Sequence, residues 1–451
     1  MRYNDFIAQT LSGENDIIWD YYGQGNNQCW NKCDLLNPQT SSRFIKEYFK
    51  SGAKELPIIL DGRDANNFIN QYFSVAQKEF ALSLNIYNDI TLPDTRATHT
   101  VSGYFLGLLV EKCLMGENSL SIHTRQCHFP FTYLWFLTYL YHDYGYCVAE
   151  REDNKSPITI PPRAPIPVQT LGNRIQLGEY RTLSAVRRKL GICLSPYSTY
   201  HSFSYIMRSP QRRPEILSAI LTELTQRSCR ISGGSNLSFS TESWISNCRY
   251  SSSITTRYFN YCINELSHAD HGIVGGYLFY DRMIKNYAMC YLSELERSNT
   301  ILDLSNFHYR DRHFCFEQLS IFSYITDCIM THNIWKANES NQNEAYERYS
   351  LYELIAENYK IITFQNNPLL YILAIADTLE PTKIYKALPI SHDDICSAIE
   401  VNYRPGEHEI TFFSNSLKVD IGELYKKAKG LEAWTSVRCS NLNDGKFTIT
   451  I

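Results

Sequence analysis

The chain has 451 residues, of which 44% are hydrophobic and 20% are charged. This length and composition support a large buried core and exclude an intrinsically disordered chain. The 43 lysines and arginines nearly balance the 47 aspartates and glutamates, and the formal net charge is -4. The balance does not favour a generally basic surface that would bind nucleic acid.

Cysteine spacing and hydropathy indicate the compartment. The 14 cysteines include no CxxC pair, so their spacing predicts neither a disulfide framework nor a zinc knuckle. The N-terminus lacks an apolar signal core, and the longest apolar runs, 104–110 and 131–141, fall short of the ~20 residues that a membrane span requires. We therefore expect a cytoplasmic protein with reduced thiols and no membrane segment.

The first half of the chain predicts an extension followed by three helices. Residues 1–63 alternate short aromatic segments with polar turns, which is typical of a helical and loop extension. Apolar residues at helical spacing then predict helices over 64–89 and 95–114, the second with His99 in its first turn. The third predicted helix, 131–146, is apolar on nearly every side and is therefore expected to be buried. His142 and Asp143 stand near its end, at the edge of a core, which favours a metal site.

Residues from 151 to about 257 differ in texture from the rest of the chain. They are rich in proline and serine and carry 15 Lys/Arg against 6 Asp/Glu, a net charge of +9, which leaves -13 for the remainder. We interpret this stretch as a basic insertion. It is either a lid that faces a phosphate-containing substrate or an accessory subdomain with solvated arginines.

The second half returns to helical periodicity and ends in strands. Apolar residues at i, i+3 and i+4 predict helices within 265–287, 315–335 and 366–385, each with one His or Asp at an otherwise apolar site. From about residue 391 the pattern changes to period two around a short helix. We expect a mainly α fold, with a helical domain over 64–390 that the insertion interrupts and a small α+β domain over 391–451.

Six metal-ligating side chains fall on five of the predicted helical segments. In chain order they are His99, His142, Asp143, His271, His332 and Asp377. With the adjacent His142-Asp143 after an apolar helix, Arg96-x-x-His99 before GYFLG, His271-x-x-x-Gly275 and the segment LLYILAIADTLEP, the sequence resembles the HD-domain superfamily of metal-dependent phosphohydrolases. The resemblance covers roughly residues 64–390 outside the insertion, and it implies an HD-domain helical bundle.

The six-ligand pattern is similar to that of HD-superfamily members that hold two metal ions. Cyclic-dinucleotide phosphodiesterases of the HD-GYP kind are such members, although the GYP segment itself is absent here. The Arg96-x-x-His99 opening is similar to that of dNTP triphosphohydrolases, whereas the text after His142-Asp143, YGYCVAERED, departs from their pattern. The resemblance implies that Asp143 bridges the two ions.

The chemistry of this donor set supports a hydrolase. Neutral imidazoles and carboxylates suit Mn, Fe, Zn or Mg, and two neighbouring ions can generate a metal-bridging hydroxide that attacks phosphorus. His142 and Asp143 are the expected centre of catalysis. His268, three residues before His271, could share its helix face and be the ligand instead, support a ligand, or act as a general acid. His332 could also be a buried structural histidine.

Three basic residues are candidates for binding substrate phosphate: Arg96, which is one helical turn before His99, Lys383 and Arg151. The expected substrate is a phosphate-containing small molecule, a nucleotide or cyclic (di)nucleotide. Two alternatives share the same residues. One is an HD-fold diiron oxygenase, because iron redox chemistry uses similar ligands. The other is a non-catalytic nucleotide sensor or scaffold.

Overall fold

The computed structural model describes the chain in segments, and the statements below concern these segments alone. They are residues 1–12, 94–123, 128–143, 158–160, 164–166, 174–176, 220–221, 223–224, 227, 235–240, 245–250, 257–265, 268–298, 302–309, 312–334, 340–351, 361–384, 392–417 and 419–451. The helix expected over 64–89 and the candidate Arg151 lie outside them.

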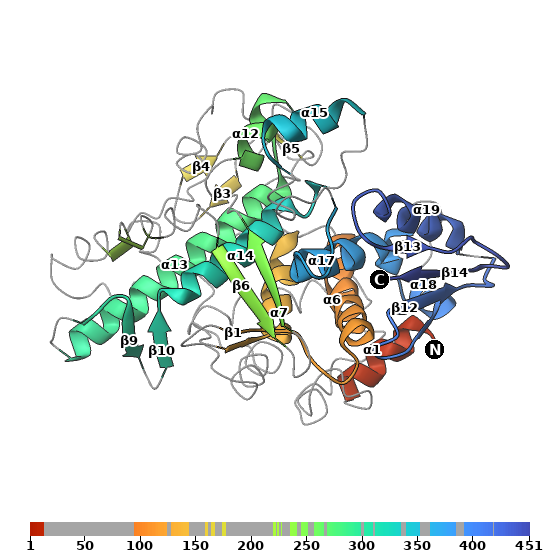
Figure 1. Ribbon diagram of the computed structural model, residues 1–451, viewed down its shortest axis with the longest axis horizontal. Helices are drawn as coiled ribbons and strands as arrows, with labels where there is room; N and C mark the ends of the chain where they lie inside the picture. The colour runs from red at the N-terminus through yellow and green to blue at the C-terminus, as the bar shows by residue number, and fades with distance from the viewer. Residues whose placement is uncertain are drawn as a thin grey trace.

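Helices dominate the described chain, as the periodicity predicted, and about 59% of it is helical (Figure 1). They are α1 (Tyr3–Ser12), α6 (Asp94–Met115), α7 (Phe131–His142), α12 (Arg257–Asn264), α13 (His271–Ser298), α14 (Glu317–Thr331), α15 (Ser340–Arg348), α17 (Pro368–Leu379), the 3₁₀ helix η6 (Pro381–Ile384), α18 (His392–Ala398) and α19 (Ile421–Leu431). Among these helices none is both long and apolar enough to cross a bilayer.

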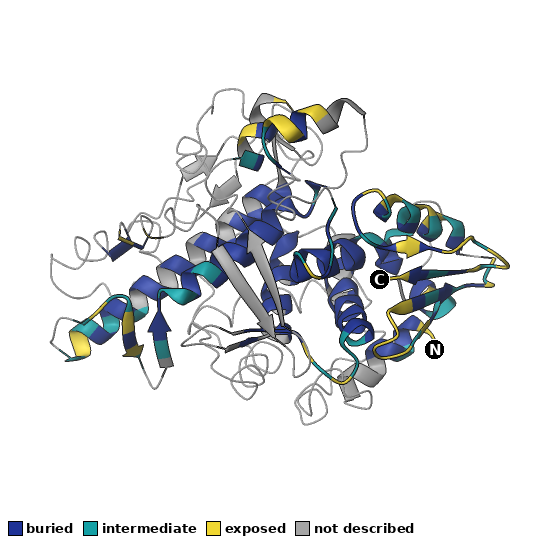
Figure 2. Cartoon of the chain, in the orientation of Figure 1, coloured by how far each residue is buried: buried dark blue, intermediate teal, exposed yellow. Residues whose placement is uncertain are grey.

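The core forms around α7, which packs against α6, α13, α14 and α17 (Figure 1). Its sequence, FTYLWFLTYLYH, has no polar face, and the side chains of Leu134, Trp135 and Tyr139 are fully buried. α14 and α17 are buried along nearly their whole length (Figure 2). A helix that is apolar all round requires neighbours, and these four helices supply them. The predicted burial is confirmed for the side chains of α7 that the structure describes.

Two pairs of glycines allow the helices to approach closely. In α6, a Cβ at Gly103 or Gly107 would overlap Tyr139 or Trp135 of α7. The Trp135 indole N–H donates to the Tyr104 carbonyl at 2.8 Å, which joins the two helices at this point. Gly272 and Gly276 of α13 face α14 in the same way. Each pair has i, i+4 spacing, so both glycines lie on one helix face.

The strands form small antiparallel sheets. They are β1 (Ser121–His123), β2 (His128–Pro130), β3 (Ile158–Ile160), β4 (Ala164–Ile166), β5 (Arg174–Gln176), β6 (Ser235–Ser240), β7 (Ile245–Tyr250), β8 (His268–Asp270), β9 (Asn306–Tyr309), β10 (Arg312–Cys315), β11 (Glu400–Tyr403), β12 (Glu409–Phe413), β13 (Arg438–Cys439) and β14 (Lys446–Thr450). One sheet has the order β2-β1-β6-β7, with Ile122 opposite Phe239. Strands from the predicted insertion thus pair with the strand segment that leads into α7.

The last 60 residues form a second sheet, with the order β11-β12-β14-β13 and α19 packed beside it. Its strands alternate buried and less buried residues, as period-two patterning predicts. The first residues of the chain join this sheet, because the Val401 N–H donates to the Met1 carbonyl at 2.7 Å and α1 packs on α18. α17 contacts α19, which links the sheet to the helical core.

Three expectations about element boundaries were wrong. α7 ends at His142, so Asp143 lies in the turn after the helix rather than inside it. His99 is the sixth residue of α6 and therefore lies in its second turn. α13 begins at His271, and His268 belongs to β8, paired with Gln176 of β5. His268 and His271 therefore do not share a helix face, because the pairing of β8 with β5 holds His268 in a strand.

Candidate metal centre

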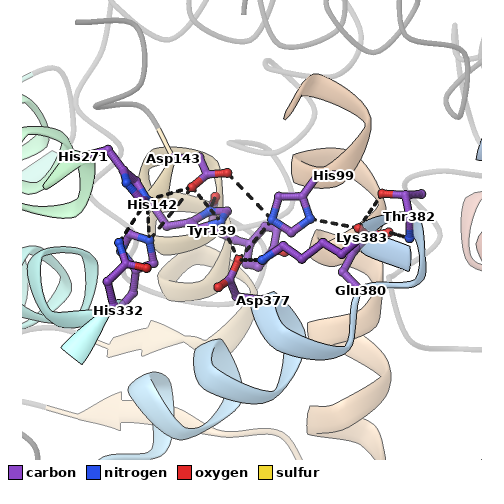
Figure 3. Close-up of polar contacts among 11 residues, drawn as sticks. His99, Tyr139, His142, Asp143, His271, His332, Asp377, Glu380, Thr382 and Lys383 are labelled. Carbon is purple, nitrogen blue, oxygen red and sulfur yellow. Dashed lines mark hydrogen bonds and ion pairs between the residues drawn. The ribbon is translucent and has the colours of Figure 1, made fainter. Parts of the chain in front are cut away.

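The ends of four helices and the interior of a fifth bring the six predicted donors together (Figure 3). His142 is the last residue of α7, with Asp143 directly after it, and His332 is the residue after α14. Asp377 stands two residues before the end of α17, and His271 begins α13. The sixth donor, His99, comes from the interior of α6. All six side chains are buried, with at most 4% of any residue exposed.

Hydrogen bonds at Nδ1 orient three of the imidazoles. At the ends of α7 and α14, the Nδ1–H groups of His142 and His332 donate to the backbone carbonyls of Tyr139 and Ile329, three residues earlier, at 2.5 and 2.6 Å. These carbonyls are available because the last turn of a helix leaves its carbonyls without helical partners. His99 donates instead to the Glu380 carboxylate, at 2.9 Å. In each case Nε2 is left with its lone pair for another contact.

The Nε2 atoms and carboxylates form two groups within the described residues. His99, His142 and Asp377 make up the first, which we call the His99 group. Its Asp377 Oδ1 lies 3.1 Å from His99 Nε2 and 3.4 Å from His142 Nε2. In each group the candidate ligand atoms all lie within 4.8 Å of one another. This arrangement would allow the three donors of the group to contact one ion.

The second group, which we call the His271 group, consists of Asp143, His271 and His332. The Nε2 atoms of its two imidazoles are 3.0 Å apart, and Asp143 Oδ1 lies 3.2 Å from that of His271. Asp143 also reaches the His99 group, because its Oδ2 lies 3.8 Å from His99 Nε2 and its Oδ1 3.5 Å from His142 Nε2. This carboxylate therefore stands between the two groups.

The charges of the cluster shift the pKa values of its members in opposite directions. Burial lowers the pKa of His142, but the carboxylates of Asp143 and Asp377 outweigh burial and raise it above 6.5. Burial, reinforced by His271 and His142, lowers the pKa of His332 well below 6.5. His332 is therefore neutral at physiological pH, which is the form that binds metal.

The donor set fits divalent metal ions. His142 Nε2 is buried and makes no hydrogen bond within the described residues, so a good ligand atom is left for an ion to satisfy. α7, α14 and α17 end at or close to the cluster, and a helix C-terminus carries partial negative charge that favours a cation. Imidazole with carboxylate suits Zn, Fe or Mn. We therefore conclude that the two groups could each hold a metal ion.

The structure adds contacts that the sequence pattern did not reveal. Glu380 hydrogen bonds to His99, and Asn333 Nδ2 lies 3.1 Å from His271 Nε2. The Tyr139 ring contacts the His142 ring in a tilted arrangement, with centroids 4.4 Å apart. Burial, together with Asp377 and the other nearby carboxylates, raises the pKa of Tyr139 well above 10. The one sequence signal that could have indicated a role for Glu380 is its position, three residues after Asp377.

The predicted phosphate-binding residues are only partly placed beside the cluster. Lys383 is close, because its Nζ lies 2.6 Å from Asp377 Oδ1 and its side chain is 20% exposed. Arg96 lies on α6 one turn before His99, and His268 lies in β8 just before His271; the side chains of both fall outside the described part. His332, for which a purely structural role was the alternative, is one of the converging donors.

Comparisons with protein-family models, with curated proteins and with solved structures give no match.

Proposed function

We propose that this protein is a metal-dependent phosphohydrolase of the HD type, which acts on a phosphoester in a nucleotide or cyclic nucleotide. The observation that carries the proposal is the pair of adjacent donor groups, with the Asp143 carboxylate between them. The order of the donors along the chain, His, His-Asp, His, His, Asp, supports the same class. The buried helical core that holds them is compatible with an HD-type bundle.

The His99 group and the His271 group would each hold one divalent ion. Such a pair of ions supplies a water activated at neutral pH and positive charge at the phosphoryl oxygens. The protein contributes the orientation of the ligands, because the Nδ1 contacts of His99, His142 and His332 hold each Nε2 toward the cluster. Asp143 adds negative charge between the two positions.

We assign binding of the substrate phosphate to Lys383, because its Nζ contacts Asp377 of the His99 group. Its ammonium has three N–H donors and contacts Asp377 Oδ1, so it can also donate to a phosphoryl oxygen. Its side chain is 20% exposed, whereas the side chain of its partner Asp377 is 3% exposed. Arg96, Arg151 and the predicted general acid His268 remain candidates from the sequence for the same substrate.

The proposal is tested on protein purified without chelator. Elemental analysis should find a divalent metal, and a panel of nucleotides and cyclic nucleotides should include one from which phosphate or a nucleoside monophosphate is released in a metal-dependent reaction. Asp143→Ala should lower kcat/KM by more than the ~100-fold that loss of a residue behind a ligand costs. His313→Ala is the control, because His313 lies in β10, outside both donor groups.

Two outcomes would overturn the proposal. One is a metal-loaded protein that hydrolyses no member of the panel. The other is an Asp143→Ala variant that is as active as the wild type. Iron as the bound metal, combined with oxygen consumption, would assign diiron oxygenase chemistry to the same residues.

A further inference from the structure

Glu380 is a buried carboxylate that stands behind His99 and belongs to neither donor group. Glu380 is 0% exposed, and its Oε2 accepts the hydrogen bond from His99 Nδ1 at 2.9 Å (Figure 3). α17 ends at Leu379, and Glu380 has an extended backbone with ψ 121°. The extended conformation follows from Pro381, because a proline disfavours helical geometry in the residue before it. The end of α17 thus places one carboxylate, from Asp377, at Nε2 of His99 and another, from Glu380, at Nδ1.

Thr382 holds the Glu380 carboxylate in place. Its backbone N–H donates to Oε1 at 2.8 Å, and its hydroxyl donates to Oε2 at 2.5 Å. The carboxylate therefore accepts three hydrogen bonds from His99 and Thr382. These contacts fix the carboxylate against the Nδ1 side of the His99 ring.

The carboxylate partner sets His99 apart from the two other imidazoles whose Nδ1 contacts are described. Nδ1 of His142 and Nδ1 of His332 donate to neutral backbone carbonyls. A carboxylate behind an imidazole fixes its tautomer and makes the opposite nitrogen a stronger ligand. The difference is confined to the His99 group, because His99 is not a member of the His271 group.

We propose that Glu380, held by Thr382, is a positioning residue that sets the affinity of the His99 group for its ion and leaves the His271 group unaffected. The inference rests on the metal centre of the proposed function. Glu380 belongs to neither donor group and contacts His99, so its effect is exerted through His99. Removing its carboxylate should lower the affinity for one of two ions, rather than weaken the centre as a whole.

The test measures Mn²⁺ binding by titration calorimetry in full-length protein. In a His332→Ala background, where the His99 group retains all its donors, Glu380→Gln should weaken Mn²⁺ binding about 10- to 100-fold. In a His99→Ala background the same substitution should leave Mn²⁺ binding to the His271 group unchanged. Thr382→Val should produce a smaller loss in the first background, and Thr382→Ser, which keeps the hydroxyl, should restore wild-type affinity.

Glu111 supplies a matched control. It is also buried and accepts hydrogen bonds from one backbone N–H, of Leu120, and one hydroxyl, of Ser119, at 2.8 and 3.0 Å. It stands 12 residues after His99 on α6, about 18 Å along the helix axis. Glu111→Gln should leave Mn²⁺ binding unchanged. NMR of the histidine ring N–H groups gives an independent readout. The downfield signal of the His99 Nδ1 proton should move upfield in Glu380→Gln and should not move in Glu111→Gln.

Three results would overturn the inference. If Glu380→Gln has no effect in the His332→Ala background, the carboxylate does not tune His99. If it weakens binding equally in both backgrounds, its role is structural. Both of these results would leave the proposed function intact. If the wild-type protein binds no Mn²⁺, Zn²⁺ or Fe²⁺ at all, the proposed function and this inference both fail.

Discussion

Replacing Gly272 with alanine should separate the stability of the helical core from the integrity of the His271 group. A Cβ at this position would lie 2.8 Å from His332 Nδ1 and 2.9 Å from the Ile329 carbonyl oxygen. These two atoms are the donor and acceptor of the 2.6 Å hydrogen bond that orients the His332 ring. The added methyl group would therefore have to displace the ring or the end of α14.

The expected loss of stability is modest. Overpacking a well-packed core costs about 1–3 kcal/mol, and the change from glycine to alanine in a helix returns about 1 kcal/mol. The free energy of unfolding of Gly272→Ala should therefore fall by about 0–2 kcal/mol. The affinity of the His271 group for its ion should fall about 10- to 100-fold, as when a contact that orients a ligand is lost.

Gly276→Ala is the matched control, because Gly276 lies one turn later on the same face of α13. Its added Cβ would meet Met330 Cγ and, at 3.0 Å, the Thr326 carbonyl oxygen, and neither belongs to the cluster. Urea unfolding should show similar losses for the two variants, whereas titration calorimetry should show weaker metal binding only for Gly272→Ala. Wild-type metal binding in Gly272→Ala, or an equal loss in Gly276→Ala, would refute the reasoning.

Three further predictions concern single buried groups. The Tyr139 hydroxyl is buried and makes no hydrogen bond within the described residues. Tyr139→Phe should therefore raise the free energy of unfolding by about 0–1 kcal/mol, with a melting temperature that is unchanged or higher. The metal content should stay the same. Asp143 and Asp377 outweigh burial and raise the pKa of His142 above 6.5, so protons compete with metal for this imidazole. Calorimetry should find that the affinity for metal rises with pH as His142 loses its proton. A metal affinity that does not change with pH would contradict the assignment of His142 as a ligand. Burial raises the pKa of Glu111 from 4.5 to about 7, so the folded state retains a proton that the unfolded state releases. The free energy of unfolding should therefore decline by roughly 3 kcal/mol more in the wild type than in Glu111→Gln as pH rises across this interval, as measured by denaturant titrations.

Local patterning was sufficient to predict the main helices and the donor types. The described side chains of the apolar run that ends in His142 are buried because an apolar face cannot meet water favourably, which is a property of the residues themselves. The period-two pattern of the tail likewise predicted its strands, since alternation follows directly from strand geometry. The six candidate ligands could be selected because each is a polar residue within or beside an apolar segment, in the chain order that resembles the HD superfamily.

The approach of these ligands to one another was decided by tertiary packing. His99 and Asp377 are 278 positions apart, and their 3.1 Å contact depends on how closely α6 and α17 pack. The pairing of β8 with β5 places His268 in a strand and not in the helix of His271. Helical spacing could not predict this pairing, because the partner strand lies almost 100 residues earlier in the chain. The partnership of Glu380 with His99 follows from the turn at Pro381 combined with the position of α6. The sequence by itself therefore determined which side chains could bind metal, whereas only the tertiary structure decided how they group and what stands behind them, since both depend on distances between segments far apart in the chain.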